Sequence, residues 1–140
     1  MKNVLNLIIC FAVSLSCTND KGGLEENVQS LELKYIAWAC DCANWATHEV
    51  LEVYSGNEND ALAKHCIFIE PATETVELPD SLGYSGDVIQ FIGSFYREKG
   101  FPSGYHSYQE PEEAKVFRYT AYEVVHSNYH LYQEDSSINE

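Results

Sequence analysis

Short apolar segments of strand length, separated by turn residues, are the feature that most constrains the fold of this chain. These segments cover residues 31–39, 65–70, 73–78, 87–96 and 114–126. In the last of them Phe117 and Tyr119 alternate with Arg118, which is the period-two pattern of a strand. Helix signals are weaker, and the one helix that we expect is short and lies near residues 61–64. The pattern predicts a mostly β domain, either a small β-barrel or a β-sandwich.

Gly93 interrupts the strongest of these segments. A glycine within a strand is typical of a bulge or a sharp bend. Residues 88–96 read Val-Ile-Gln-Phe-Ile-Gly-Ser-Phe-Tyr and are followed by a Gly-Phe-Pro turn. This stretch resembles the third-strand region of OB-folds, in which a glycine lets one strand serve both halves of the barrel. The core that we expect consists of Leu33, Ile36, Trp38, Ile67, Ile69, Val88, Ile92, Phe117 and Val124.

The N-terminus reads as an export signal. Lys2 precedes an almost uninterrupted apolar run over residues 4–13, and Ser14-Leu15-Ser16 then leads to Cys17. The run has the length of a signal-peptide core and is too short to cross a bilayer as a helix. The Leu-Ser-Cys ending resembles the lipobox of bacterial lipoproteins, which implies cleavage before Cys17 and palmitate-type acylation of its thiol. The alternative is an ordinary signal peptide with an unmodified Cys17.

This interpretation divides the chain into four parts. We expect a lipoprotein signal peptide over residues 1–16, a lipidated flexible tether over 17–30, a β-barrel domain over 31–132 and a polar tail over 133–140. Removing residues 1–16 removes Lys2 and no acidic residue, so the formal charge changes from −14 to −15. Such a charge repels nucleic acids and anionic lipid surfaces. The N-terminal lipid must therefore supply the attachment to a bacterial membrane in the cell envelope, the outer membrane rather than the inner one.

Cys40, Cys42 and Cys66 remain in the predicted domain. Residues two apart on a strand point to the same face, so Cys40 and Cys42 would lie side by side if the strand continued through them. A disulfide from Cys66 to either one, with Cys40 preferred, would close a loop of about 25 residues and stabilise the fold by roughly 3 kcal/mol. In an oxidising compartment we favour this bridge over metal binding.

Two alternatives use the same cysteines differently. The first is a zinc site in which Cys40, Cys42 and Cys66 are joined by His48. The second is a redox function, although Cys-Asp-Cys is not the Cys-x-x-Cys motif of thioredoxin-like proteins. No Gly-x-Ser-x-Gly, His-Glu-x-x-His or Gly-rich phosphate loop occurs in the sequence, so we predict that the protein is not an enzyme and needs no cofactor.

Aromatic residues gather in the predicted loops. Tyrosine offers a large contact area at low entropic cost, so loop tyrosines often mark a contact surface for a protein or a glycan. The alternative is that they cap the open ends of a small barrel. The binding candidates are Tyr96, Phe101, Tyr105, Tyr108, Tyr129 and Tyr132.

Four short motifs together resemble a family of small Bacteroidota lipoproteins with an OB-fold-like β-barrel. They are Trp-Ala-Cys-Asp-Cys at 38–42, Cys-Ile-Phe-Ile-Glu-Pro-Ala at 66–72, Gly-Ser-Phe-Tyr at 93–96 and Lys-Val-Phe-Arg-Tyr at 115–119. The resemblance spans roughly residues 31–125 and implies a fold and a location, not an activity. From the residues we expect a lipid-anchored binding or interaction module of the envelope. An inhibitor or immunity-type protein for one dedicated, basic partner is an alternative.

Overall fold

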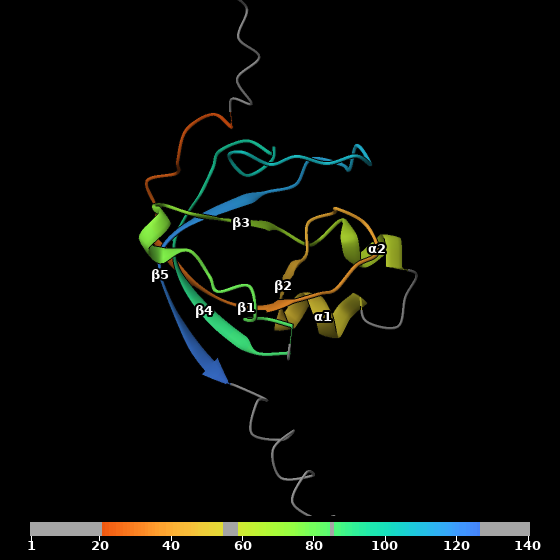
Figure 1. The fold of residues 1–140 in the computed structure, drawn as a ribbon, viewed down its shortest axis with the longest axis horizontal. Coiled ribbons are helices and arrows are strands. Elements are labelled where there is room, and N and C mark those ends of the chain that lie inside the picture. The colour runs from red at the N-terminus through yellow and green to blue at the C-terminus, as the bar shows by residue number, and fades with distance from the viewer. Residues whose placement is uncertain (1–20, 55–58, 85, 127–140) are drawn as a thin grey trace, which may run out of the picture.

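The computed structural model describes residues 21–54, 59–84 and 86–126, within which five strands form one curled sheet (Figure 1). The strands are β1 (Gln29–Tyr35), β2 (Trp45–Thr47), β3 (Phe68–Pro71), β4 (Val88–Phe95) and β5 (Val116–His126). The helices are α1 (His48–Tyr54), α2 (Asn59–Ala63) and the 3-10 helix η1 (Glu74–Val76). The predicted mostly β class is confirmed.

The order of the strands makes the sheet a partly open barrel. The order is β2-β1-β4-β5-β3, and only the β3–β5 pair is parallel. Trp45 and Ile67 also exchange backbone hydrogen bonds of 3.2 and 2.8 Å, which brings β2 beside the start of β3. This circular order with one parallel pair is OB-like. The segment that resembles the third strand of OB-folds, however, forms the fourth strand here, β4, so that part of the prediction is wrong.

The barrel interior is apolar and aromatic. Its buried residues are Leu33, Trp45, Ile89, Phe91, Phe117 and Tyr119. The prediction of a core position is confirmed for Leu33 and Phe117 but wrong for Ile92 and Val124, which are 42% and 36% exposed. Ile92 lies on the face of β4 that also carries Gln90 and Ser94, whereas Ile89 and Phe91 face the core. Val124 pairs with the buried Ile89 but lies close to the end of β5 at His126.

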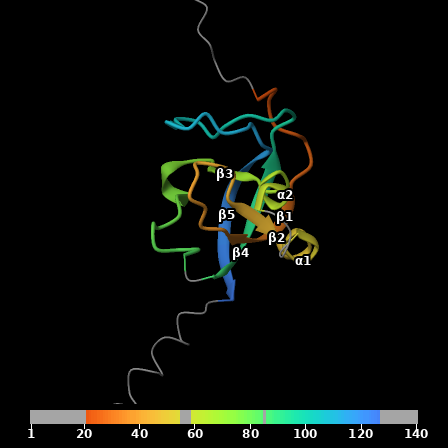
Figure 2. The ribbon, with the colours of Figure 1, turned by 90° about the vertical axis from the view of Figure 1, so that its right-hand side faces the viewer.

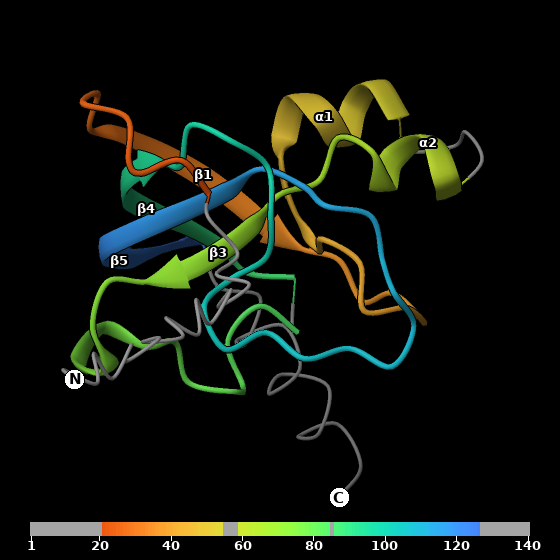
Figure 3. The ribbon, with the colours of Figure 1, turned by 90° about the horizontal axis from the view of Figure 1, so that it is seen from above.

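A second apolar cluster lies outside the barrel, beneath α1 and α2. Phe68 and Val116, paired across β3 and β5, are buried there with Leu62 and Cys66. Figures 1 and 3 show the two helices together on one side of the barrel and η1 on the opposite side. Helix α1 begins after Thr47, whose Oγ1 accepts a hydrogen bond from the Val50 N–H (3.3 Å).

The sequence prediction differs from these elements in three places. It missed β2 and α1, since a Val-rich segment such as residues 48–54 is ambiguous between helix and strand. The short strand expected over 73–78 is wrong, because that segment contains η1. Helix α2 overlaps the helix expected near residues 61–64. Within the described residues no helix is long and apolar enough to cross a membrane.

The flexible tether expected over 17–30 is wrong for residues 21–30, which belong to the folded domain. Leu24 forms a bridge with Tyr96, and β1 begins at Gln29. Lys21 is buried and forms an ion pair with Glu70, which is buried as well. Glu70 Oε1 also accepts a hydrogen bond from the Tyr96 hydroxyl (2.7 Å), and Oε2 accepts one from the Ser103 N–H (2.9 Å). The N-terminal segment is therefore held to the barrel by a buried ion pair, and both carboxylate oxygens of Glu70 accept hydrogen bonds.

Gly93 lies at an irregularity of the β4–β5 pairing, as its position in the sequence predicts. The register shifts between Ile92 and Gly93, which is the signature of a bulge. A Cβ atom at this position would lie 2.1 Å from the Arg118 carbonyl oxygen and 2.8 Å from Tyr119 Cα. Because both obstacles are backbone atoms, β5 can approach β4 this closely only where a glycine stands.

We expect Gly93→Ala to lower the free energy of unfolding by about 3 kcal/mol, because the methyl group must displace a strand. Gly104→Ala is the matched control. Gly104 has a φ of 74° and no atom within 4 Å of a new Cβ, so only the left-handed backbone penalty of about 1–2 kcal/mol applies. Urea unfolding measures both variants. A Gly93→Ala variant no less stable than Gly104→Ala would contradict the close approach of the two strands.

Candidate binding site between two loops

The cysteines of the Cys-Asp-Cys motif are bonded to each other. A disulfide joins Cys40 and Cys42, whose Cα atoms are 5.3 Å apart, and Cys66 is a free, buried thiol. The predicted bridge from Cys66 to Cys40 or Cys42 is therefore wrong. Strand β1 ends at Tyr35, and the hydrogen bond from the Ile36 N–H to the Asn44 carbonyl (2.8 Å) closes a loop that carries the motif away from the sheet.

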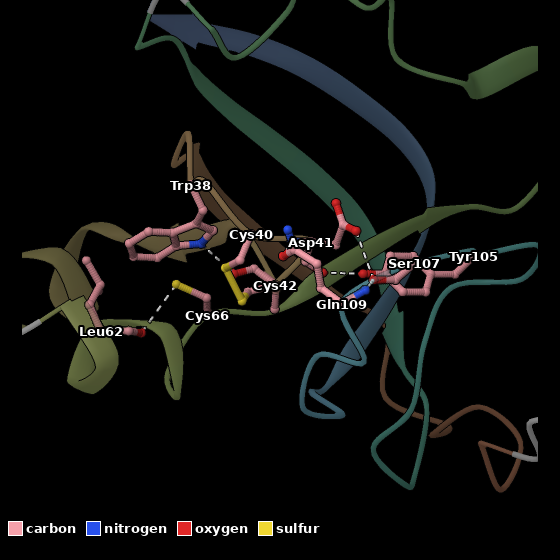
Figure 4. The surroundings of a disulfide bond; sticks show 10 residues. Trp38, Cys40, Asp41, Cys42, Leu62, Cys66, Tyr105, Ser107 and Gln109 are labelled. Carbon is pink, nitrogen blue, oxygen red and sulfur yellow. Dashed lines mark hydrogen bonds between the residues drawn. A yellow bond between two sulfur atoms is a disulfide. The ribbon is translucent and has the colours of Figure 1, made fainter.

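Cys66 lies in the second apolar cluster, away from solvent. Its Sγ donates a hydrogen bond to the Leu62 carbonyl (3.4 Å), as Figure 4 shows. Burial raises the pKa of this thiol to about 11. Cys66 is therefore protonated and poorly nucleophilic at neutral pH.

The structure does not assemble the alternative zinc site. Cys40 and Cys42 are consumed by their disulfide, and His48 lies on the exposed side of α1, where Nε2 contacts Glu52 at 3.0 Å. Among the residues that the structure describes, no group of three His, Cys, Asp or Glu side chains is placed to hold a metal ion.

Asp41, between the two cysteines, joins the loop over residues 36–44 to the loop over residues 96–115. Its backbone carbonyl accepts a hydrogen bond from the Tyr105 hydroxyl, and its carboxylate accepts one from Ser107 Oγ (2.8 Å). Its N–H donates to Gln109 Oε1 (3.3 Å). Figure 4 shows these three side chains meeting Asp41 from one side. These three hydrogen bonds tie the two loops to each other. The long loop runs over the upper end of the barrel in Figure 2.

Aromatic rings support this junction from below. Phe101 and Tyr105 stack with ring centres 5.0 Å apart, and Tyr105 also packs on Phe68 at 5.3 Å. Trp38 is fixed by its indole N–H, which donates to the Ala43 carbonyl (2.8 Å). Burial raises the pKa of the Tyr105 hydroxyl, and the Asp41 charge adds to this effect against an opposing hydrogen bond from Ser107. Tyr105 is therefore a hydrogen-bond donor throughout the neutral range.

An open cavity of about 380 Å³ lies between the two loops and strands β2 and β3. It is lined by Tyr35, Trp38, Cys40, Asp41, Cys42, Asn44, Trp45, Phe68, Ile69, Pro102 and Tyr105. Comparison with protein-family models, curated proteins and solved structures found no match. The geometry of the cavity itself must therefore indicate what it can bind. Aromatic side chains and fixed polar groups line this cavity together, and such a combination is typical of small-ligand sites.

Of the predicted binding residues that the structure describes, only Tyr105 lines this cavity. Phe101 stacks on Tyr105, and the hydroxyl of Tyr96 donates a hydrogen bond to the buried Glu70. Tyr108 is fully exposed and is not part of the lining, while Tyr129 and Tyr132 lie outside the described residues. Sequence reasoning missed Tyr35, Trp38 and Asn44 as site residues. The signal that would have found them is the pair of tryptophans flanking the Cys-Asp-Cys motif.

Proposed function

We propose that this protein is a lipid-anchored binding module of the bacterial cell envelope, and that the cavity between the two loops holds its ligand. The observation that carries the proposal is the composition of that cavity. Tyr35, Trp38 and Tyr105 supply aromatic surface, and Asp41 and Asn44 supply polar groups beside it. Hydrogen bonds to Trp38 and Asp41 hold this surface in place before a ligand arrives, which reduces the entropic cost of binding.

A neutral oligosaccharide fits this composition best. Aromatic rings carry partial negative charge on their faces, which attracts the polarised C–H groups of a sugar ring. Carboxylate and amide side chains such as those of Asp41 and Asn44 can accept hydrogen bonds from sugar hydroxyls. The formal charge of −14 opposes anionic ligands, so phosphate-rich polymers are disfavoured. OB-type barrels offer oligosaccharides a surface of this kind, between loops at one end of the barrel.

Binding can be tested by calorimetric titration of the protein with a panel of neutral oligosaccharides built from glucose, mannose and N-acetylglucosamine. We expect at least one to bind, and we expect Trp38→Ala to weaken its affinity at least tenfold. Tyr108→Ala is the matched control, because Tyr108 is an exposed loop aromatic outside the cavity. The proposal fails if no member of the panel binds at millimolar concentration, or if the two variants lose affinity equally.

The membrane attachment rests on Cys17, which lies outside the described residues. We expect Cys17→Ala to abolish incorporation of labelled palmitate and to remove the protein from the membrane fraction, because the acylated residue is lost. Cys10→Ala, a change within the expected signal peptide, serves as the control and should leave both properties intact. A Cys17→Ala protein that still carries label and sediments with membranes would contradict the lipoprotein interpretation.

A further inference from the structure

The Cys40–Cys42 disulfide contributes little to holding the fold together. It closes a ring around the single residue Asp41, and the loop-closure entropy that a disulfide removes from the unfolded chain becomes smaller as the closed loop becomes shorter. It also crosslinks no two elements of the barrel, since both cysteines belong to the loop over residues 36–44. Because the bond adds so little to the stability of the fold, we look for its role in the chemistry of the two sulfur atoms.

The two sulfur-bearing residues differ in access to solvent. Cys40 is exposed, whereas Cys42 is half-buried. Cys42 lines the cavity described above and also a second cavity of about 500 Å³. Figure 4 shows the bond with Trp38 on one side and Asp41 on the other. An incoming thiolate can therefore reach Cys40 more easily than Cys42.

The second cavity sets the electrostatic surroundings of Cys42. Lys64 and Lys99 line it together with Glu112 and Glu113. The ammonium groups favour a thiolate at Cys42, and the two carboxylates oppose it, so neither charge dominates this wall. Accessibility therefore decides the direction of exchange, with Cys40 attacked and Cys42 as the leaving sulfur.

We propose that Cys40–Cys42 is a thiol–disulfide exchange site that accepts electrons from the dithiol of a partner protein. One partner thiolate attacks Cys40 Sγ, the Cys40–Cys42 bond breaks, and Cys42 leaves as a thiolate that takes a proton. The partner's second thiolate then attacks its own sulfur in the mixed disulfide and releases Cys40, which is protonated in turn. Two electrons and two protons pass to Cys40 and Cys42, and the partner is left with a disulfide.

The third cysteine of the domain does not take part in this exchange. Cys66 is buried, hydrogen-bonded to Leu62 and held as a neutral thiol. Asp41, in contrast, is held from outside the ring by Tyr105, Ser107 and Gln109. These contacts keep the turn in place when the bond opens, so the two cysteines stay close enough to close the bond again.

The first test is reduction of the native, full-length protein by dithiothreitol at pH 8, followed by alkylation and mass mapping. We expect Cys40 and Cys42 to become alkylated while Cys66 stays unmodified and the circular dichroism spectrum is unchanged. A bond that opens only after denaturant is added would overturn the proposal. This readout does not involve oligosaccharide binding, so the two proposals can fail independently.

The second test assigns the attacked sulfur, with oxidised glutathione as the probe. In a Cys66→Ser background, Cys42→Ser should form a glutathione adduct at Cys40 at least ten times faster than Cys40→Ser forms one at Cys42. Adduct formation is followed by intact mass, and the circular dichroism spectrum of each variant confirms that it is folded. Equal rates, or a faster reaction at Cys42, would overturn the assignment of Cys40 as the entry point.

Discussion

Glu70→Leu should lower the free energy of unfolding by about 3–5 kcal/mol, because it leaves the Lys21 ammonium buried without its counter-charge. Lys21 and Glu70 side chains are only 6% and 7% exposed. The substitution also removes the acceptor of the Tyr96 hydroxyl and of the Ser103 N–H. Urea unfolding followed by fluorescence gives the difference directly.

The double variant Lys21→Met with Glu70→Leu is the matched control for this effect. It removes both charges, so the penalty of an unpaired buried ion disappears. The hydroxyl of Tyr96 and the N–H of Ser103 remain without their acceptor, which costs about 1–3 kcal/mol. We therefore expect the double variant to be more stable than Glu70→Leu alone. A double variant as unstable as the single one would show that the charge pair is not what holds residues 21–30 to the barrel.

The same pair predicts a loss of stability in acid. Burial alone would raise the pKa of Glu70, but hydrogen bonds from Lys21, Tyr96 and Ser103 outweigh it and hold the pKa below its ordinary value. A lowered folded-state pKa means that the stabilisation is complete above the unfolded value of about 4.3 and is lost as the pH falls through the folded value. Glu70→Gln should therefore flatten the decline of stability below about pH 4.3 relative to the wild type.

Phe91→Ala should cost about 3–5 kcal/mol of unfolding free energy, the range for removing a large buried aromatic side chain. Phe91 is completely buried and packs on Trp45 and Tyr119, with ring centres 5.4 and 5.0 Å away. The neighbouring Ile92→Ala is the control, since Ile92 is 42% exposed and should cost about 1 kcal/mol or less. Thermal unfolding measures both. A larger loss for Ile92→Ala would mean that β4 turns its other face inward.

This comparison also shows how far the sequence predicted the fold. Strands β1, β4 and β5 were predicted because each is long and carries period-two alternation or a dense apolar run. Gly93 was predicted to lie at a bulge because glycine inside such a run has few other uses. The choice of Ile92 rather than Phe91 as a core residue was wrong, because the polar residues Gln90 and Ser94 mark the face of Ile92 as the more polar one.

The candidate site was harder to predict, because it depends on contacts between distant segments. Tyr105 was expected in a contact surface, but nothing in residues 96–115 indicates that its hydroxyl reaches Asp41. The predicted bridge from Cys66 assumed that the strand continues through Cys40 and Cys42. The chain leaves the sheet at Tyr35 instead, which gives the two cysteines a different geometry. The ion pair between Lys21 and Glu70 could not be predicted, because a polar segment without apolar periodicity indicates a linker.

The measurement that tests the proposed binding function most directly is a heteronuclear NMR titration of the isotope-labelled protein with the tightest-binding oligosaccharide of the panel. We predict shift changes at the Trp38 indole N–H and at the amides of Asn44 and Tyr105, with none at Gln90 and Thr120 on β4 and β5. Shift changes confined to those two strands, or a titration without shift changes at Trp38 and Tyr105, would contradict the assignment of the cavity as the ligand site.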